Sequence, residues 1–537
     1  MNRILVFLSW SWLALAPSAP GHASVVGEWA GWLDMDDGDV PVRLHVGEED
    51  GALVTVIDLP AAGQIGVRLG STLVSGGSWT IAHPSAEDPR VRLSIEPAAD
   101  GTDGRHRRGA VEWFGVAGRV DLHRAEGPLH WEPPAVAREV VGLYGDDDGG
   151  RRIVRATSWG ELVLVDPEVG LERGLFPRAE GEYRIGPARY VPAPVERTAR
   201  AERDDEGDVV AWVETEGGVS RRFPRLELLE DEVVVERDGV ELVGSLVHPG
   251  PPGAPVAVVA GGSDWTDRDR VRDVSLLLAS FGVASVIHDK RGHGESGGEE
   301  TVPFREIAAD LRAFADAARG LDAVAGGRVG YLGLSRGGWY GPLAAAGDPE
   351  AAFFVDVVGP AVSPIEQETT ARLDRMREGG ASAEAIALGE RYLDAMWTFT
   401  RTRKDGDALL ALRAEVEEAG WLGVLLGPPD LDDASWEWMR LNGDFDPKST
   451  LRALRCPTLA LFGEEDLAVA ARTNAPAMRA ALRDSAADPA RVEVLPNADH
   501  GLRIVRRDAT GARLPYHRGV GYHPEAWRTI ASFIRSN

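Results

Sequence analysis

The fold of this chain is decided by the stretch Val329–Gly338, which has the sequence VGYLGLSRGG. Its first part, Val329–Leu332, is a short apolar run typical of a buried strand. Glycines stand two residues before and two residues after Ser335, and the run Trp339–Ala346 that follows is compatible with a helix. A sharp strand-to-helix turn needs small residues at these positions, and it holds a serine hydroxyl clear of its surroundings. The stretch therefore predicts a turn that presents Ser335 as a nucleophile.

The same five-residue pattern occurs a second time, around Ser296, in a chain that contains 63 Gly. Ser296 follows a polar, Gly-rich segment and precedes Glu299 and Glu300, and no predicted strand touches it. Because the turn requires a strand before the serine and a helix after it, we predict a nucleophilic role for Ser335 and a structural role for Ser296.

Outward from this turn, residues 230–537 show apolar runs that alternate with amphipathic stretches. Such alternation predicts a mainly parallel sheet flanked by helices, the α/β class. Asp238-Gly239 marks a leading hairpin between Val233–Glu236 and Val240–Val247. The further predicted strands are Val256–Ala260, Val283–His288, Val329–Leu332, Phe353–Val358, Thr458–Phe462 and Val492–Leu495.

One interval, about residues 361–447, is too long to be a loop between two strands. We expect a helical lid there, with helices over Thr369–Arg377, Ala383–Thr400 and Ala408–Ala419 and with Ser382 as an N-cap. Its large apolar side chains belong either to an acyl pocket or to the core of the lid itself. These side chains are Trp397, Trp421, Trp436, Trp438 and Met439.

Two polar groups follow late strands of the predicted sheet. Asp466 comes after Thr458–Phe462, and His500 comes after Val492–Leu495. Open α/β sheets place their sites at the carboxyl ends of strands, so these side chains should meet Ser335. The order Ser, Asp, His predicts a nucleophile, an orienting acid and a general base. Glu465 is the rival for the acid, and Asp499 is interpreted as a turn residue or a partner behind His500.

At this point residues 230–537 resemble an α/β-hydrolase of the serine esterase and serine-aminopeptidase-like group. The segment Asp289–Gly298, DKRGHGESGG, is similar to the loop of that group after its fourth strand, and Gly262–Asp269, GSDWTDRD, is similar to its oxyanion loop. The β-rich region before residue 230 resembles the extensions on exported bacterial esterases of this group.

The resemblance implies an oxyanion hole made by the backbone N–H groups of Ser263 and Arg336. The sequence departs from the group at Gly261, where relatives usually carry His, and at Asp264, whose carboxylate would disfavour an oxyanion unless it is turned away or paired. Arg268 or Arg291 is the predicted partner of Asp264.

The N-terminal part has a different character. Short alternating runs separated by Gly, Asp and Pro predict two β-rich domains, residues 24–132 and 135–229, on either side of Pro133-Pro134. Residues 1–23 have a positive start, an apolar centre and a small-residue end, and they predict a signal peptide cleaved after Ala23. We therefore expect export by the general secretory route to the periplasm or the extracellular space.

Composition narrows the function further. A formal net charge of −27 over 537 residues disfavours nucleic acid and anionic membranes as partners, and no later segment is predicted to span a membrane. Cys456 is the single cysteine and is expected to be buried; no metal and no cofactor are predicted. The leading hypothesis is hydrolysis of a small-molecule carboxylic ester. The alternatives are an aminopeptidase-like or amide hydrolase and a non-catalytic binding protein with the same fold, and the oligomeric state stays open.

Overall fold

The computed structural model describes residues 25–537, except for positions 36–37, 50, 60–63, 70, 76, 84–90, 99–104, 114–115, 126–138, 157–161, 179–180, 251, 264–265, 426–430, 432, 434, 508–512 and 515–520. The predicted signal peptide and the predicted boundary at Pro133-Pro134 lie outside the described residues. No helix in the described part of the chain is long and apolar enough to cross a membrane.

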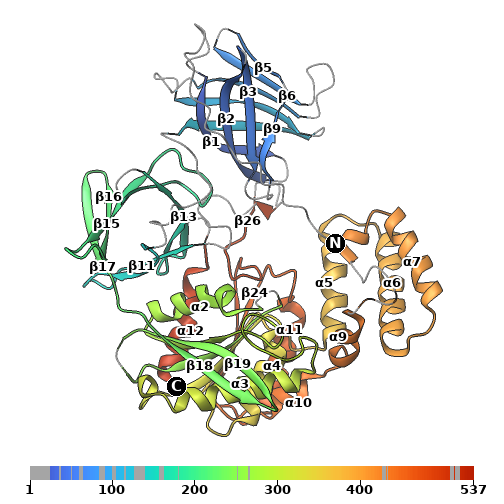
Figure 1. Cartoon of the computed structure of the whole chain (residues 1–537). Coiled ribbons are helices and arrows are strands. Elements are labelled where there is room, and N and C mark those ends of the chain that lie inside the picture. Colours follow the sequence, from blue (N-terminus) through green and yellow to red (C-terminus); the bar gives the residue numbers. More distant parts are fainter. Residues whose placement is uncertain are drawn as a thin grey trace.

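The first β-region is one antiparallel sheet of nine strands in the order β4-β3-β2-β1-β9-β8-β7-β6-β5 (Figure 1). The sheet curls so that β3 meets β5, where the hydroxyls of Thr55 and Thr72 are hydrogen-bonded at 2.8 Å. Inside the curl, Trp29 packs edge-on against Trp79 with ring centroids 4.8 Å apart. The strands are β1 (Gly27–Met35), β2 (Gly38–Glu49), β3 (Ala52–Leu59), β4 (Gln64–Arg68), β5 (Ser71–Ser75), β6 (Ser78–His83), β7 (Val91–Pro97), β8 (His106–Trp113) and β9 (Val116–Arg124).

The second β-region is an eight-stranded antiparallel meander, with its strands in chain order from β10 to β17. A bridge between Tyr144 and Arg225 brings its two ends together, and Trp212, Tyr144 and Tyr183 pack in the enclosed core. The strands are β10 (Gly142–Gly145), β11 (Arg151–Ala156), β12 (Leu162–Asp166), β13 (Leu171–Pro177), β14 (Glu182–Ile185), β15 (Arg197–Arg203), β16 (Val209–Glu216) and β17 (Val219–Pro224).

The third sheet has the order β18-β19-β21-β20-β22-β23-β24-β25. Strand β19 is antiparallel to both of its neighbours, and all pairs from β21 to β25 are parallel, as the alternating pattern predicts. Asp238 and Gly239 turn the leading hairpin with φ values of 54° and 76°. The strands are β18 (Leu229–Arg237), β19 (Val240–His248), β20 (Val256–Ala260), β21 (Ala284–His288), β22 (Val329–Leu334), β23 (Phe354–Val357), β24 (Thr458–Gly463) and β25 (Ala490–Leu495).

Helices cover both faces of this sheet. One face packs against α3 (Phe304–Arg319), α4 (Gly337–Gly347) and α11 (Ala471–Arg483), and the other against α2 (Arg268–Ser280) and α12 (Pro524–Ser536). Side chains of the second β-region, including Ile153 and Val165, join the core on the α2 side. The second β-region therefore lies against the helical layer of the third sheet that contains α2 and α12 (Figure 1).

The predicted lid is helical, and Figure 1 shows its larger helices as a separate group beside the sheet. Ser382 accepts a hydrogen bond from the Ala385 amide at 3.2 Å, which confirms its predicted role as an N-cap. The helices between β23 and β24 are α5 (Pro364–Glu378), α6 (Ala383–Thr402), α7 (Gly406–Glu418), α8 (Leu422–Leu425), α9 (Ser435–Asn442) and α10 (Pro447–Arg452).

Candidate active site

Ser335 stands at the turn between β22 and α4, with a left-handed φ of 52°. This conformation costs a non-glycine residue energy, so the surrounding packing must enforce it. Gly333 and Gly337, on either side of Ser335, must be glycines because the backbone leaves no room for a side chain at either position. A Cβ on Gly337 would lie 2.0 Å from the carbonyl oxygen of Ala260, and a Cβ on Gly333 would lie 2.8 Å from that of Gly337. The turn is therefore the strained one that the sequence predicts, and Ser335 on it is half-buried.

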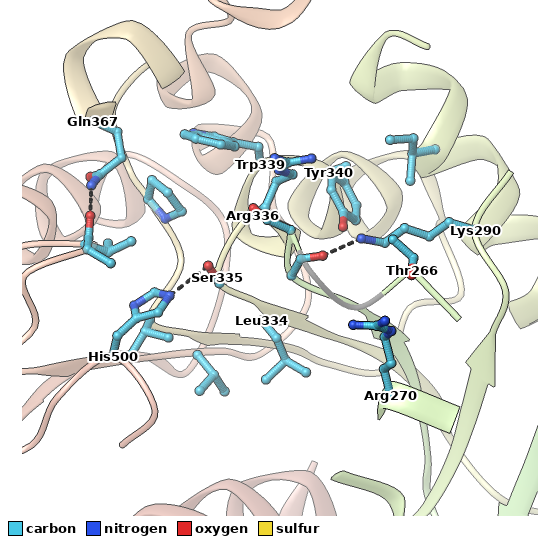
Figure 2. A pocket seen from close by; sticks show the side chains of 18 of the residues that line it. Thr266, Arg270, Lys290, Leu334, Ser335, Arg336, Trp339, Tyr340, Gln367 and His500 are labelled. Carbon is cyan, nitrogen blue, oxygen red and sulfur yellow. Dashed lines mark hydrogen bonds between the residues drawn. The ribbon is translucent and has the colours of Figure 1, made fainter. Parts of the chain in front are cut away.

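Ser335, His500 and Asp466 form a continuous hydrogen-bonded chain. His500 Nε2 lies 2.9 Å from Ser335 Oγ (Figure 2), and His500 Nδ1 lies 2.8 Å from Asp466 Oδ2. The other oxygen of Asp466 accepts the backbone N–H groups of Ala468 and Val469 at 2.7 and 2.8 Å. Because Asp466 is buried and fully hydrogen-bonded, it fixes the orientation of the imidazole and favours the tautomer that is protonated at Nδ1.

The pKa of His500 reflects this position. Burial alone would lower the pKa, but the Asp466 carboxylate, with a contribution from Asp499, raises it above the ordinary value of about 6.5. The nearby Arg375 acts in the opposite direction. A base of this kind accepts a serine proton readily once it is neutral.

The rival residues have other partners. Glu465 binds Arg507, with Oε2 2.5 Å from Nη2, and so it does not orient His500. Asp499 accepts hydrogen bonds from the backbone N–H groups of Gly501 and Arg503, each at 2.8 Å, as expected of a turn residue.

Ser296 is buried and has a structural role. Its hydroxyl donates to the Asp289 carbonyl at 2.8 Å and accepts the Val243 amide at 2.9 Å. It therefore ties the loop after β21 to strand β19, and its hydroxyl is fully used in doing so.

The loop that follows β20 lies directly against Ser335. A Cβ on Gly262 would lie 3.3 Å from Ser335 Cβ and 3.8 Å from its Oγ. The Tyr340 hydroxyl donates to the Gly261 carbonyl, and Lys290 Nζ donates to the Gly262 carbonyl, a contact drawn in Figure 2. In a trans peptide the N–H points away from the C=O, so Lys290 fixes the direction of the Ser263 amide. These two side chains hold a loop whose sequence departs from its relatives at Gly261.

Asp264, the carboxylate that the sequence places beside this loop, lies outside the described residues. The two arginines predicted to pair with it are engaged elsewhere. Arg291 binds Asp310 at 2.5 Å, and Arg268 lies 3.6 Å from Asp289 and also contacts Glu295.

Ser335 and His500 border a cavity of about 1210 Å³ that extends under the lid. Of the large apolar lid side chains singled out in the sequence, four line the cavity, and Trp421 does not; it packs beside Gly379. Trp397 and Trp436 are also buried in the core of the lid, so both interpretations of the lid aromatics hold in part. The four that line the cavity are Trp397, Trp436, Trp438 and Met439.

One group of side chains among the described residues has spacing suited to a metal ion, and it lies in the first β-region. Asp121 Oδ1 is 2.9 Å from His106 Nε2 and 3.5 Å from His123 Nε2. Asp121 Oδ2 also binds Arg108 at 3.0 Å, so an ion-pair cluster explains the group without a metal. The sequence pattern does not reveal this group, because His106 and His123 meet only through the register of β8 and β9.

The profile of the X-Pro dipeptidyl-peptidase (S15) family matches residues 238–483, which is less than half of the chain. The match includes Ser335 and Asp466 and ends before His500. A comparison with curated proteins gives no match.

Several solved structures are similar to this chain. An esterase of Pyrococcus furiosus is 17% identical over 51% of this chain and 84% of its own, with a TM-score of 0.34. A putative dienelactone hydrolase from Klebsiella pneumoniae is 18% identical over 58% of this chain and 100% of its own, with a TM-score of 0.35. An α/β hydrolase from a Penicillium species is 17% identical over 51% of this chain and 91% of its own, with a TM-score of 0.34.

The mainly parallel third sheet, with helices on both faces, and the strand-to-helix turn at Ser335 are features of an α/β-hydrolase fold. An antiparallel β-rich region precedes this sheet. The chain is therefore a hydrolase of the α/β-hydrolase superfamily with a β-rich N-terminal region.

Proposed function

We propose that this chain is a serine hydrolase that cleaves carboxylic esters through an acyl-enzyme. Ser335 is the nucleophile, His500 the general base and Asp466 the acid that orients it. The observation that carries the proposal is the unbroken chain from Ser335 Oγ through the imidazole to Asp466, with contacts of 2.9 and 2.8 Å.

The mechanism follows from these contacts. His500 Nε2 takes the proton of Ser335 as Oγ attacks the ester carbonyl, and Asp466 stabilises the imidazolium that forms. The backbone N–H groups of Ser263 and Arg336 stabilise the oxyanion, with the first amide oriented by Lys290. His500 then returns its proton to the leaving alcohol, and a water molecule activated by the same imidazole hydrolyses the acyl-enzyme.

The choice of ester as the scissile group is supported by the cavity, which has aromatic and thioether walls suited to an acyl chain or an aryl group. A peptidase is the second candidate, because the matching family is one of X-Pro dipeptidyl-peptidases. The two candidates share the triad and differ in the leaving group.

A comparison of p-nitrophenyl esters of increasing chain length with aminoacyl-p-nitroanilides, including X-Pro-p-nitroanilides, tests this choice. If the protein is an esterase, kcat/KM should be far higher for the esters than for the nitroanilides. Ser335→Ala should lower kcat/KM for the esters by about 10⁴- to 10⁶-fold. Ser296→Ala is the matched control, with activity retained and a stability loss of about 1–3 kcal/mol from its two broken hydrogen bonds. Ester turnover that survives Ser335→Ala would refute the assignment.

Labelling by a fluorophosphonate separates an enzyme from a binding protein with the same fold. Intact-mass analysis should show one adduct, located at Ser335 and absent from Ser335→Ala. We further propose that the protein is exported, on the basis of the signal-like sequence of residues 1–23. Determination of the N-terminus of the mature protein from its native host tests that proposal.

A further inference from the structure

Positively charged side chains surround the cavity at Ser335, although the chain as a whole carries a net charge of −27. The carboxylates that line the same cavity are Asp273, Asp289, Glu300, Asp310 and Glu368. The arginines that line it are Arg270, Arg291, Arg336, Arg372, Arg375 and Arg503.

Each of these carboxylates has a partner within the protein, but Glu300, exposed at the rim, has only His293, which is charged only when protonated. The carboxylates inside the cavity are therefore not left over for a cationic substrate. Asp289 accepts two backbone N–H groups, at 2.8 and 2.9 Å. The side-chain pairs are Asp273–Arg155 at 2.6 Å, Asp310–Arg291 at 2.5 Å, Glu368–Arg372 at 3.2 Å and, at the exposed rim, Glu300–His293 at 3.5 Å.

Two of the arginines differ from the others because no carboxylate within the described residues pairs with them. These are Arg336 and Arg375; the remaining four each bind an acidic side chain. Helix α5 shows the contrast directly. Its Arg372 binds Glu368 and its Arg377 binds Asp374 at 2.9 Å, whereas Arg375 between them lines the cavity.

The two unpaired arginines line the same cavity as Ser335 and His500. Arg336 directly follows the nucleophile, and its guanidinium stacks 4.5 Å from the ring centre of Trp438 in the lid. Figure 2 shows Arg336 beside Trp339 and Tyr340, on the side of Ser335 away from His500. Arg375 lies near His500, close enough for its charge to oppose the rise in the pKa of that imidazole.

A cation at the edge of a partly desolvated cavity attracts an anion strongly, and a guanidinium binds a carboxylate with two parallel N–H donors. We propose that the substrate is a carboxylate-bearing ester, with Arg375 and Arg336 binding its carboxylate while Ser335 attacks its ester carbonyl. This proposal rests on the proposed function for the identity of the scissile bond. It also predicts that a free ammonium group near the scissile bond is unfavourable, since the cavity presents no unpaired carboxylate in the described part of the chain.

Binding is measured first, without any turnover, on the Ser335→Ala protein. The ligands are monomethyl succinate, monomethyl adipate and monomethyl sebacate, each beside its carboxamide and its ammonium analogue of equal chain length. Calorimetric titration at pH 7 should show the best carboxylate ester binding at least about tenfold more tightly than its carboxamide, and the ammonium analogue more weakly than both. Equal binding of carboxylate and carboxamide, or tighter binding of the ammonium analogue, would overturn the proposal.

Turnover of the same methyl esters by the protein with Ser335 intact, followed by proton release, gives the second measurement. Arg375→Gln and Arg336→Gln should each reduce the ratio of kcat/KM for the carboxylate ester over the carboxamide ester by about tenfold. Arg377→Gln, on the same helix but outside the cavity, is the matched control and should leave the ratio unchanged. A loss that is equal for both esters would show that the arginines act on stability or on the nucleophile, which contradicts the proposal.

The two measurements distinguish this proposal from the proposed function. If the carboxylate is preferred in binding and no ester is hydrolysed, the ester assignment fails and the carboxylate site stands. If all the esters are hydrolysed and bound without regard to charge, the ester assignment stands and the carboxylate site fails.

Discussion

Glu172 of the second β-region binds Arg503, which stands three residues after His500, with Oε2 3.0 Å from Nη1. The two residues are 331 positions apart in the sequence, and both side chains are largely or wholly buried. Glu172 also binds Arg155 at 2.8 Å, and Arg155 binds Asp273 of α2 at 2.6 Å. Burial alone would raise the pKa of Glu172, but Arg503 and Arg155 lower it to about 2. The second β-region is therefore fastened to the loop that carries His500, the proposed general base.

Glu172→Gln should lower kcat, because it frees the loop that positions His500. Glu172 itself does not line the cavity, but its partner Arg503 does, so KM reports separately on the newly unpaired arginine. The substitution should also destabilise the protein by up to about 3–5 kcal/mol, since two arginines lose a buried anion. Steady-state kinetics and urea unfolding measure the two effects. Glu202→Gln breaks an exposed pair with Arg222 in the same sheet and serves as the control. An unchanged kcat in Glu172→Gln would mean that the β-region does not support the base.

Asp466→Asn should shift the acid limb of the pH–rate profile. His500 acts when neutral, and Asp466 raises its pKa, so the activity of the intact protein is lost as the pH falls through that raised pKa. Without the carboxylate the pKa falls, and the acid limb moves to lower pH. The rate itself should drop by about 10³–10⁴, because the imidazole loses its orienting partner. If the acid limb of Asp466→Asn stays at the same pH, the raised pKa of His500 must come from Asp499 instead. The variant Asp499→Asn tests this alternative directly.

Lys290→Met should lower kcat and leave KM nearly unchanged. Lys290 Nζ holds the Gly262 carbonyl, and so it sets the direction of the Ser263 amide that we propose as an oxyanion donor. The loss should stay below the roughly 10²–10³ that follows removal of a whole donor. Tyr340→Phe, which frees the Gly261 carbonyl, should act in the same direction. Lys404→Met, at an exposed position, is the control, and a rise in KM alone would indicate that Lys290 binds substrate rather than positioning the loop.

Asp356→Asn should make the protein more stable at neutral and alkaline pH. Burial raises the pKa of Asp356 to about 8, with the Gly359 amide opposing the rise. The folded state therefore holds a proton that the unfolded state releases near pH 4, so stability falls as the pH rises from about 4 to about 8. Asn removes this dependence, and the gain at pH 7 should be on the order of 2–4 kcal/mol.

Urea unfolding at pH 4.5, 7 and 8.5 checks this expectation for Asp356→Asn. The exposed Asp205→Asn serves as the matched carboxylate control and should show no such trend. A stability difference from the original protein that does not grow with pH would mean that Asp356 is ionised in the folded protein.

Much of the third sheet follows from local pattern. Its strands are predicted within a few residues, because short apolar runs bounded by turn signals are typical of buried strands. The helix limits in the lid were less accurate: α5 begins at Pro364 rather than Thr369, with Ser363 as its N-cap. The first turn has one aliphatic side chain, Ile365, followed by Glu366, Gln367 and Glu368, so apolar periodicity alone does not mark where the helix begins.

The sequence by itself determined the strained turn that presents Ser335, because this turn is a local structure that needs glycines at Gly333 and Gly337. It also determined the chain order of serine, acid and base. Only the tertiary structure decided between Asp466 and its neighbour Glu465, since adjacent side chains point to different partners that arrive from distant segments. Only the tertiary structure also shows that Glu172 pairs with Arg503, and that Arg375 has no carboxylate partner among the described residues. Packing between distant segments decides which charged side chains meet, and the spacing of residues in the sequence does not encode these contacts.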